Sequence, residues 1–397
     1  MSKLGWQRAL LGSLIDTQKG YAFKSGWYCE TGRRIVKVSN FTEDSIESSG
    51  LTCIPESTAA EYLKYQLRVG DVIVQTVGSW PNNPASVVGK CVRTPSEVAG
   101  SLLNQNAVKL SPSTHLEKQF LYYLLRNEDF KTYIVGTAQG AASQAAITLE
   151  AIRGYEFNLP PLSAQQRIAG ILSAYDELIE NSQRRINILE SIARALYREW
   201  FVHFRFPGHE NHPRVASSLG EIPEGWEVRK LEQLASIKGG KQLEKEDINE
   251  AGEFPVFGGN GIQGYSERST HQGFVIAFGR VGAYCGSIHW SYGGAWLNNN
   301  SSSVVPQNHD ELVLHHLLDF NFTNLRGGAA QPFISNSALA GVDLLYPGDA
   351  LAAKFCSLVK PLRLQQVTLE KAVQNLRCTR DLLLPRLLSG QINAEAA

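Results

Sequence analysis

The sequence predicts an α+β fold. Two similar domains of short strands and helices are separated by two long antiparallel coiled-coil helices, with internal two-fold pseudo-symmetry. Three observations predict this fold: the chain repeats itself, each copy has short apolar runs between turn residues, and each copy is followed by a long heptad pattern. With 397 residues, the chain is long enough for two or three domains with their own cores.

The internal repeat appears when the chain is aligned with itself. The offset between matching positions is 220 near the start and becomes 187 further on, so the second copy is shorter than the first. A shared frame therefore carries different insertions. The matched pairs are Trp6 with Trp226 and Gly20 with Gly240 at the first offset, then Gln144 with Gln331, Ile147 with Ile334 and Pro160 with Pro347 at the second.

Each copy is expected to fold as short strands followed by short helices. Runs rich in Val, Ile and Phe lie between clusters of Gly, Asn, Pro and Ser, as strands do, and two later segments have helical apolar spacing. The expected strands are 34–41, 70–78, 274–282 and 301–306, and the expected helices are 118–127 and 311–320.

The segment after the first copy predicts a long helix from Ser163 to about Phe204. It contains Gly170 as its single glycine and has no proline, and Ser163 with Gln166 has the spacing of a capping box. Apolar or small residues recur at alternating steps of four and three, which is the a/d seam of a coiled coil. The seam residues are Ile168, Leu172, Tyr175, Ile179, Ser182, Ile186, Leu189, Ala193, Leu196 and Trp200.

The same seam recurs at the second offset with two polar interruptions, Gln366 and Arg380. Pro361 and Pro385 are expected to start, kink or end this second helix near those points. The second seam is Phe355, Val359, Leu362, Gln366, Leu369, Val373, Leu376, Arg380, Leu383 and Leu387.

These patterns predict four segments: a first domain over 1–162, a first long helix over 163–205, a linker with the second domain over 206–347, and a second long helix over 348–392. Either helix alone could simply be an amphipathic helix packed on its own domain. At about 1.5 Å per residue, however, the first would span roughly 60 Å, more than one small domain covers. We therefore interpret the helices as an antiparallel spacer with one domain at each end.

Composition excludes several classes of protein. Hydrophobic residues at 43% and charged residues at 19% are typical of a globular chain, and no apolar run approaches the roughly 20 residues of a membrane span. The N-terminus lacks the pattern of a signal peptide, so we expect a cytoplasmic protein. The six cysteines form no C-x-x-C pair, which argues against a disulfide framework or a zinc site. With 38 basic and 38 acidic residues, DNA binding would need charges segregated on one face or shared with a partner.

Residues 254–265 contain a G-x-G-x-x-G sequence at Gly259, Gly261 and Gly264. In a dinucleotide-binding fold these glycines follow a buried strand and open an apolar helix. Here a polar segment follows, so the sequence favours a tight turn that presents Asn260, Gln263 and Tyr265.

Other catalytic patterns are also missing from the sequence. No phosphate-binding G-x-x-x-x-G-K-[ST] occurs, and the segment Asn158 to Leu162 lacks the aromatic ring that a base-flipping adenine methyltransferase loop needs. His315 and His316 lie on an expected helix, where one buried and one solvated histidine is more common than a metal pair. We expect no catalytic residue and no metal ligand in this chain.

Two similar but non-identical domains with two-fold symmetry match a two-part DNA site, because duplex DNA has pseudo-two-fold axes perpendicular to its length. Since the domains differ, the two half-sites should differ in sequence. The helices would set their spacing, and we expect one to two helical turns of roughly 34 Å each.

Four segments in order also resemble the specificity subunits of type I restriction-modification enzymes: 159–201, the linker 206–231, residues 254–265 and the tail LLLPRLLSGQI at 382–392. The resemblance covers essentially the whole chain. It implies two target-recognition domains in a non-catalytic DNA-binding subunit. It also implies two modification subunits that dock on the long helices, bind S-adenosylmethionine and methylate adenine, and restriction subunits driven by ATP and Mg. No cofactor is expected in this chain itself.

Candidate DNA-contacting residues were chosen because Arg and Lys bind phosphate or guanine, while Asn and Gln can pair with adenine. Each could instead be an ordinary turn or loop residue. The candidates are Ser39, Asn40, Gln75, Ser79, Trp80, Asn104, Gln105 and Gln144 in the first domain, and Lys241, Asn260, Gln263, Tyr265, Arg280, Asn298, Asn299 and Gln331 in the second.

Two alternatives stay open at this point. One is a separate specificity subunit of another restriction-modification type, whose partner is a fused nuclease and methylase. The other is an interaction scaffold, whose helices hold protein partners and whose domains bind peptides or glycans. Sequence-dependent DNA affinity with a steep salt dependence would separate a DNA reader from a scaffold.

Overall fold

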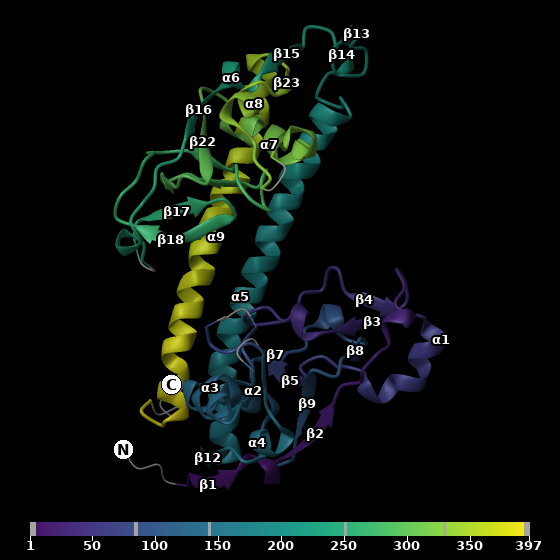
Figure 1. Ribbon diagram of the computed structural model, residues 1–397, viewed down its shortest axis with the longest axis vertical. Helices are drawn as coiled ribbons and strands as arrows, with labels where there is room; N and C mark the ends of the chain where they lie inside the picture. The colour runs from purple at the N-terminus through teal and green to yellow at the C-terminus, as the bar shows by residue number, and fades with distance from the viewer. Residues whose placement is uncertain (1–4, 83–85, 142–143, 250–251, 329–330, 393–397) are drawn as a thin grey trace. The chain divides into compact units, whose positions relative to one another are not determined.

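A computed structural model describes residues 5–82, 86–141, 144–249, 252–328 and 331–392 (Figure 1). The chain divides into two compact units. Unit 1 comprises residues 1–181 and 372–397, and unit 2 comprises residues 182–371. Each unit combines a globular α+β part with one segment from each of two long helices, so the predicted class of fold is confirmed.

The globular part of unit 1 is built on small sheets. Its central sheet is antiparallel with the order β2-β9-β5-β7, and a three-stranded sheet has the order β4-β3-β8. The central strands are β2 (Ile15–Lys19), β9 (Ala107–Pro112), β5 (Val72–Gln75) and β7 (Cys91–Arg93); the second sheet has β4 (Thr52–Ile54), β3 (Arg33–Val36) and β8 (Leu102–Leu103).

The described residues of this part of unit 1 also form two further sheets and four short α-helices, beside several 3-10 turns. The strands are β10 (Gln139–Ala141), β11 (Gln144–Ala146) and β6 (Val77–Gly78) in one sheet, and β1 (Gln7–Leu10) with β12 (Glu156–Leu159) in the other. The helices are α1 (Glu56–Ala59), α2 (Lys118–Arg126), α3 (Glu128–Gly136) and α4 (Leu149–Arg153).

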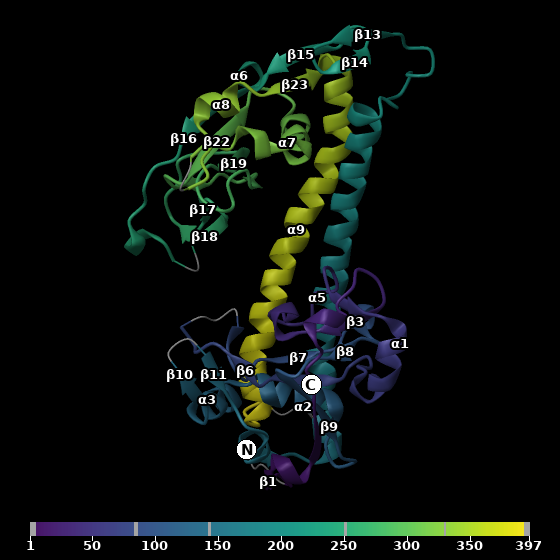
Figure 2. The ribbon, with the colours of Figure 1, turned by 45° about the vertical axis from the view of Figure 1, so that its right-hand side comes forward.

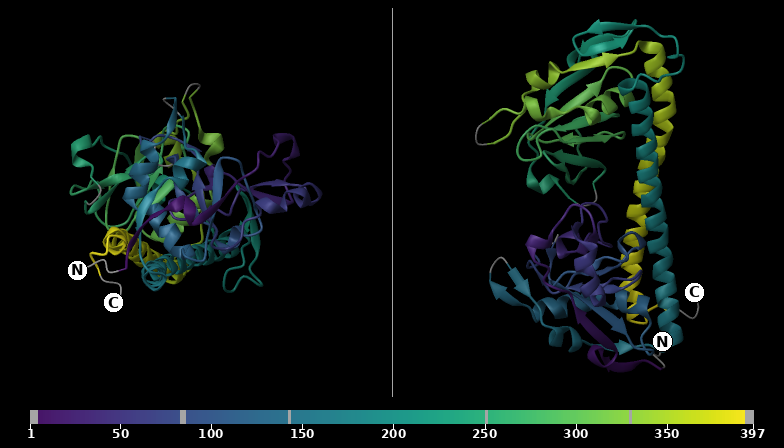
Figure 3. Two further views of the ribbon diagram at one scale, coloured as in Figure 1. Left: turned by 90° about the horizontal axis from the view of Figure 1, so that it is seen from below. Right: turned by 90° about the vertical axis from the view of Figure 1, so that its right-hand side faces the viewer.

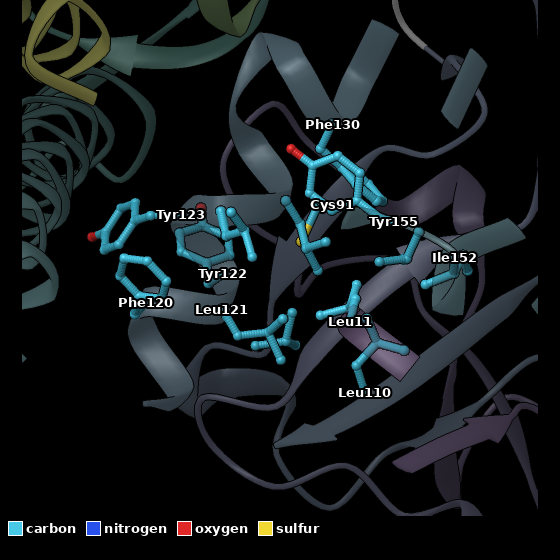
Figure 4. Packing of buried hydrophobic residues seen from close by; sticks show 14 of the residues in the cluster. Leu11, Cys91, Leu110, Phe120, Leu121, Tyr122, Tyr123, Phe130, Ile152 and Tyr155 are labelled. Atoms are coloured by element: carbon cyan, nitrogen blue, oxygen red, sulfur yellow. The ribbon is translucent and has the colours of Figure 1, made fainter. Parts of the chain in front are cut away.

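The core of unit 1 lies between the central sheet and α2. Leu11, Leu110 and Leu121 are at most 1% exposed, and Figure 4 shows them beside Ile152 and Tyr155. Every residue of β5 is buried, which explains the apolar run from Val72 to Val74. This core fixes the ends of the strands from which the loops emerge.

Unit 2 repeats the plan with a shorter chain. Its central sheet has the order β16-β22-β19-β20 and its three-stranded sheet the order β18-β17-β21. The strands are β16 (Ala235–Gly239), β22 (Ser301–Pro306), β19 (Val275–Gly279), β20 (Ile288–Ser291), β18 (Gly261–Ser266), β17 (Phe254–Gly258), β21 (Trp296–Leu297), and the pair β15 (Glu227–Lys230) with β23 (Asp343–Tyr346). The helices are α6 (Leu231–Leu234), α7 (Asp310–Asp319) and α8 (Asn336–Ala340).

The strand register confirms the internal repeat. Gln7 pairs with Leu159 in unit 1, and Glu227 pairs with Tyr346 in unit 2, which are the same two positions under the two offsets of the repeat. A tight approach recurs as well. A Cβ on Gly20 would lie 2.1 Å from the carbonyl oxygen of Asn104, and one on Gly240 would lie 1.9 Å from that of Asn298. Glycine is therefore required at both matched positions.

Most of the expected short elements agree with the structure to within a few residues, but the expected strand 34–41 is wrong in its second half, because β3 ends at Val36 and Val38–Asn40 forms a 3-10 helix. The run 301–306 coincides with β22, and the expected helices 118–127 and 311–320 correspond to α2 and α7. The linker contains structure that was not expected: β13 (Arg214–Ser217) and β14 (Gly220–Pro223) form an antiparallel hairpin. No helix in the described ranges is long and apolar enough to cross a membrane.

The first long helix, α5, runs over Leu162–Tyr197 and continues as a π-helical turn over Arg198–Val202. Because the helix begins at Leu162, Ser163 lies inside it and is not the N-cap, so the predicted capping box is wrong by position.

The second long helix, α9, runs without interruption over Asp349–Leu388, so neither Pro361 nor Pro385 starts or ends it. Both prolines lie on the exposed face of α9. A carbonyl that loses its intrahelical donor there can bond to water instead, so the prolines are tolerated.

The predicted seam residues of both helices are buried or half-buried. Within unit 2, Gln366 lies against Ile186 and Phe355 against Trp200, so numbers fall along α9 as they rise along α5; Figures 2 and 3 show these segments side by side. In unit 1, Arg380 pairs with Asp176, while Leu387 packs in the cluster that contains Ile168. The helix segments are therefore antiparallel within each unit.

Polar bonds explain the two interruptions of the second seam. The Gln366 side-chain amide donates to the carbonyl of Ile186 at 3.0 Å. The Arg380 guanidinium, 2% exposed, donates to Asp176 at 2.7 Å and to Asp44 at 3.1 Å. Buried polar side chains with such partners are tolerated in a helix interface.

The prediction for the paired histidines is wrong in one respect, because both His315 and His316 are buried, at 1% and 5% exposed. His316 Nδ1 lies 2.8 Å from the Tyr197 hydroxyl, and His315 Nδ1 lies 2.8 Å from the Glu311 carbonyl oxygen. Burial lowers the pKa of His315 to about 3 and that of His316 to about 4. Both rings are therefore neutral packing groups. All six cysteines are free thiols.

Candidate nucleic-acid interface

In unit 2, four loops that carry candidate residues are tied together by hydrogen bonds to backbone carbonyls. The turn between β17 and β18 accepts a bond at Gly259 O from Ser287 Oγ, at 2.9 Å. Arg280 N donates to Asn300 O at 3.0 Å, and Gly282 N donates to Pro332 O at 2.9 Å. Candidates that are far apart in sequence are thereby brought to one group of loops.

The segment 254–265 is a β-hairpin, not a dinucleotide-binding turn. Gly258 pairs with Gly261 across a turn made of Gly259 and Asn260, and the register then shifts so that Val256 pairs with Gly264. The shift is a β-bulge at Gln263, which redirects that side chain. The expected tight turn with exposed Asn260 and Gln263 is therefore confirmed as local structure.

Asn298 is 8% exposed, and its side chain forms hydrogen bonds that connect two of these loops. Its amide nitrogen donates to Gln263 Oε1 at 2.6 Å, and its amide oxygen accepts from Asn300 N at 2.9 Å. Both ends of the Asn298 side chain are occupied. In this structure the side chain holds the β-bulge and the 298–300 loop, and a base contact by Asn298 stays a prediction.

Among the candidates of unit 2, Arg280 is a cation whose side chain is already held in place. Its guanidinium lies 5.0 Å from the centre of the Phe333 ring, and a Cβ on Gly239 would lie 3.3 Å from its Nη1. Across the described residues, its buried Nε has no hydrogen-bond partner. An arginine that is half-buried and stacked on a ring suits a phosphate oxygen or the edge of a guanine through the exposed part of its guanidinium.

The other candidates of unit 2 line the surface around these loops. Lys241, Asn299 and Gln331 are exposed, and Tyr265 is half-buried. Gln331 belongs to the loop that bonds to Gly282, and a Cβ on Gly282 would lie 3.9 Å from its amide nitrogen. These side chains offer amide and ammonium groups close to the Arg280 loop.

Unit 1 has the same backbone frame. Thr76 N donates to Asn106 O at 2.8 Å and Ile147 N donates to Thr76 O at 2.9 Å. In unit 2, Arg280 occupies the place of Thr76, with the corresponding bonds to Asn300 and Ile334, both at 3.0 Å. One frame therefore carries a hydroxyl in one unit and a guanidinium in the other.

Two candidates of unit 1, Gln75 and Asn104, are buried. Gln75 is fully buried because its amide nitrogen donates to the carbonyls of Val77 and Ser86, at 3.0 and 3.1 Å, and so braces the loop between them. Asn104 is 7% exposed and lies against Gly20, where the backbones approach closely. Neither residue presents an exposed amide edge in this structure.

The remaining candidates of unit 1 are accessible to differing degrees. Ser39 and Gln144 are exposed, while Asn40 caps its own turn by accepting from Lys37 N at 2.8 Å. The Trp80 indole donates to Ala141 O at 2.9 Å, which ties its loop to β10. Ser79 and Gln105 are half-buried.

The sequence analysis missed a basic aromatic surface of unit 1. The rings of Tyr21 and Tyr62 are 4.4 Å apart, and Tyr65 is 5.4 Å from Tyr21. Lys24 and Lys64 lie 5.4 and 4.9 Å from the ring centres of Trp27 and Tyr65. Lysines beside rings suit the sugar-phosphate backbone. Alternating Lys and aromatic residues over 21–28 and 62–65 were the available signal.

No group of three or more His, Cys, Asp and Glu within the described part of the chain could hold a metal ion.

Comparison with known proteins gives the class. Residues 3–191 and 223–348 match the family described as "Type I restriction modification DNA specificity domain". Fold and family together define a non-catalytic protein of DNA sequence recognition. The chain belongs to this family, as a specificity subunit of a type I restriction-modification system.

Individual relatives agree with this assignment. The chain is 26% identical over 316 residues to the type I restriction enzyme MjaIX specificity subunit of Methanocaldococcus jannaschii, covering 74% of this chain and 73% of that protein. It is 20% identical over 417 residues to the HindI specificity subunit of Haemophilus influenzae, covering 83% and 88%. The crystal structure of the type I restriction-modification S subunit from M. genitalium has the same fold, with a TM-score of 0.60, 19% identity and 96% of each chain covered.

Proposed function

We propose that this chain reads a bipartite, asymmetric DNA site and recruits adenine methyltransferase and restriction subunits to it. In this proposal residues 1–162 and 206–347 form the two target-recognition domains, and 163–205 with 348–392 form the helical spacer between them. S-adenosylmethionine, ATP and Mg belong to the partner subunits. We expect the complex to work in the cytoplasm, where its DNA lies.

The observation that supports two different half-sites is the shared frame with unlike side chains. Thr76 and Arg280 occupy the same backbone position and are bonded in the same way, but Thr76 is buried whereas Arg280 is half-buried, so unit 2 presents a guanidinium where unit 1 presents no accessible side-chain donor. The strands behind them pair in the same register in both units. Two domains with the same backbone arrangement but different side-chain donors fit a DNA site with two different half-sequences.

Within this proposal, the accessible candidates carry the DNA contacts and the buried ones support their loops. Base-resolution methylation mapping in cells that express the complete system tests this. A target with two defined half-sequences is expected, and substitutions in unit 2 should alter only one of them. A single contiguous target, or changes in both halves from one substitution, would contradict it.

Exposed apolar residues on α5 support partner docking. Ile188 and Ile192 are 52% and 48% exposed and lie one helical turn apart within unit 2. Large aliphatic side chains on an otherwise polar helix face favour a protein partner. The I188K/I192K variant should lose co-purification with the methyltransferase subunit. A matched control, Q183K/N187K on the same helix, adds the same charge and should keep it; equal loss in both variants would contradict docking through these isoleucines.

The same co-purification identifies the partner class. Separate methyltransferase and restriction chains support the proposal, whereas a fused nuclease-methylase partner would favour another restriction-modification type.

A further inference from the structure

Two buried residues of opposite charge occupy equivalent positions on the long helices. Asp176 on α5 and Arg363 on α9 are matched by the same offset that relates the two helical seams. The side chain of Asp176 is 10% exposed and that of Arg363 is 1% exposed. We call the helix surface around Asp176 in unit 1 seat 1, and the surface around Arg363 in unit 2 seat 2.

The same strand position of each globular part meets these residues. Arg93 pairs with Val72 in the central sheet of unit 1, and Trp290 pairs with Ile276 in that of unit 2. Val72 and Ile276 in turn pair with Leu110 and Val304, which lie at matching positions of β9 and β22. Arg93 and Trp290 are therefore structural equivalents.

In seat 1 the helix supplies the anion. Arg93 Nη2 lies 3.4 Å from the Asp176 carboxylate, and the Tyr123 hydroxyl donates to it at 2.6 Å. Arg380 on α9 adds a third donor at 2.7 Å. The buried carboxylate thus has partners from β7, α2 and α9.

In seat 2 the helix supplies the cation. The Arg363 guanidinium lies 4.6 Å from the centre of the Trp290 ring, and its Nε lies 3.7 Å from the carboxylate of Glu311 on α7. Its Nη1 donates to Gln366 Oε1 at 2.9 Å. The globular part here presents an aromatic face and a carboxylate, which both attract a cation.

The two contacts are chemically incompatible if the globular parts are exchanged. Trp290 and Glu311 would face Asp176, placing carboxylates and a negative ring face together. Arg93 would face Arg363, placing two guanidinium groups together in a buried site. Like charges that are buried and unpaired are strongly unfavourable.

We propose that Asp176 and Arg363 are positioning residues that assign each globular part to its own seat on the helices. They fix which part occupies seat 1 and which occupies seat 2, and hence the order in which two different readers are held. This goes beyond the proposed function, because it concerns how the readers are matched to the helices, whatever sequences they read.

A purely stabilising role makes a different prediction. Buried ion pairs are weak stabilisers compared with apolar residues of the same size, but removing one partner is costly. If these residues only stabilise, each substitution should be harmful independently of what it faces. If they match the parts to the seats, the effect of a substitution should depend on the residue opposite.

The first test is a double-variant cycle in unit 2 of the full chain. R363D places a carboxylate against Trp290 and Glu311, and W290R places a second cation against Arg363. Each single variant should lower the unfolding midpoint by about 6–20 °C. The double variant W290R/R363D recreates the arginine-aspartate contact of unit 1, so it should be more stable than either single variant. The proposal is overturned if the unfolding midpoint of the double variant does not exceed that of both single variants. A double variant that does not fold counts as this outcome.

An exposed ion pair is the matched control. Lys131 and Glu128 on α3 form a pair at 2.7 Å with side chains 52% and 78% exposed. The reversed pair E128K/K131E should shift the midpoint by less than about 4 °C, because exposed pairs contribute little. A shift as large as that of the buried variants would show that charge reversal in general, and not the seat, causes the effect.

The second test asks whether R363D shifts the unfolding midpoint in opposite directions in two chains. In a full-length chimera, residues 227–346 are replaced by a second copy of residues 7–159, so that a copy of Arg93 faces Arg363. R363D should lower the midpoint of the natural chain but raise that of the chimera. The proposal is overturned if R363D shifts the midpoint in the same direction in both chains. It is also overturned if the chimera folds neither with Arg363 nor with the R363D substitution.

Discussion

Removal of the Arg280 guanidinium should weaken DNA binding by a calculable amount. The ring of Phe333, 5.0 Å away, already orders this side chain, so binding sacrifices little of its conformational freedom. An arginine that reads one guanine contributes roughly 1–3 kcal/mol of discrimination, and a phosphate contact contributes about 0.9 to the salt slope. R280A should therefore weaken binding by about 5- to 150-fold.

The assay is the dissociation constant of the methyltransferase complex on its target duplex, measured between 50 and 200 mM salt. R280K separates the two contacts. A lysine should restore a phosphate contact, which needs only a charge, but not a bidentate guanine contact, which needs the planar fork. If Arg280 contacts a guanine, methylation mapping of R280K should show relaxed specificity at one base of one half-site.

The control is R229A, which removes the same charge from β15. Arg229 is already engaged, with its Nε 2.8 Å from Glu227 and its guanidinium 4.0 Å from the Tyr346 ring centre. Its affinity should stay within about twofold of the natural complex, a change of only about 0.4 kcal/mol. Unchanged affinity and salt slope for R280A, or equal loss in R229A, would refute the assignment of Arg280 to DNA.

Three further predictions concern the buried histidines, the basic aromatic surface and the helical spacer. The folded pKa values of His315 and His316, about 3 and about 4, lie below the unfolded value of 6.5, so the unfolded state binds more protons and stability falls as pH drops from about 6.5 toward 4. At pH 5 the loss is about 2 kcal/mol per histidine, and H315Q should flatten the decline in thermal unfolding midpoints; an equally steep decline would contradict this origin. K24A/K64A in the basic aromatic surface should weaken binding equally for all sequences and reduce the salt slope by about 1 to 2, and an unchanged slope would exclude both lysines from phosphate contact. Inserting one heptad in each of α5 and α9 adds about 10.5 Å, or roughly 3 base pairs, between the half-sites. An unchanged gap in the methylation motif would refute the helices as a spacer.

Strand and helix positions were predictable where a local pattern decides them. The run 301–306 coincides with β22, and the heptad steps identified the buried face of α5, because apolar spacing reports burial directly. The prolines of α9 misled the sequence analysis. Whether Pro361 interrupts a helix depends on which face it occupies, and that is set by packing.

The candidate contacts divide in a similar way. Asparagine and glutamine in loops are reasonable candidates by residue type, yet Gln75 and Asn298 are buried and bond to neighbouring loops. Nothing local separates them from exposed Asn260 or Gln331, because an amide serves equally as a loop brace or as a base reader. Burial by distant segments decides between the two roles.

The sequence by itself determined the repeat, the two heptad seams and the family, because all three are written as residue spacing along the chain. Only the tertiary structure decided that Thr76 and Arg280 share one backbone position, and that Asp176 and Arg363 meet different chemistry at equivalent places. Those relations join segments remote in sequence, and their energies depend on burial and on the partner within a few ångströms, which no local pattern encodes.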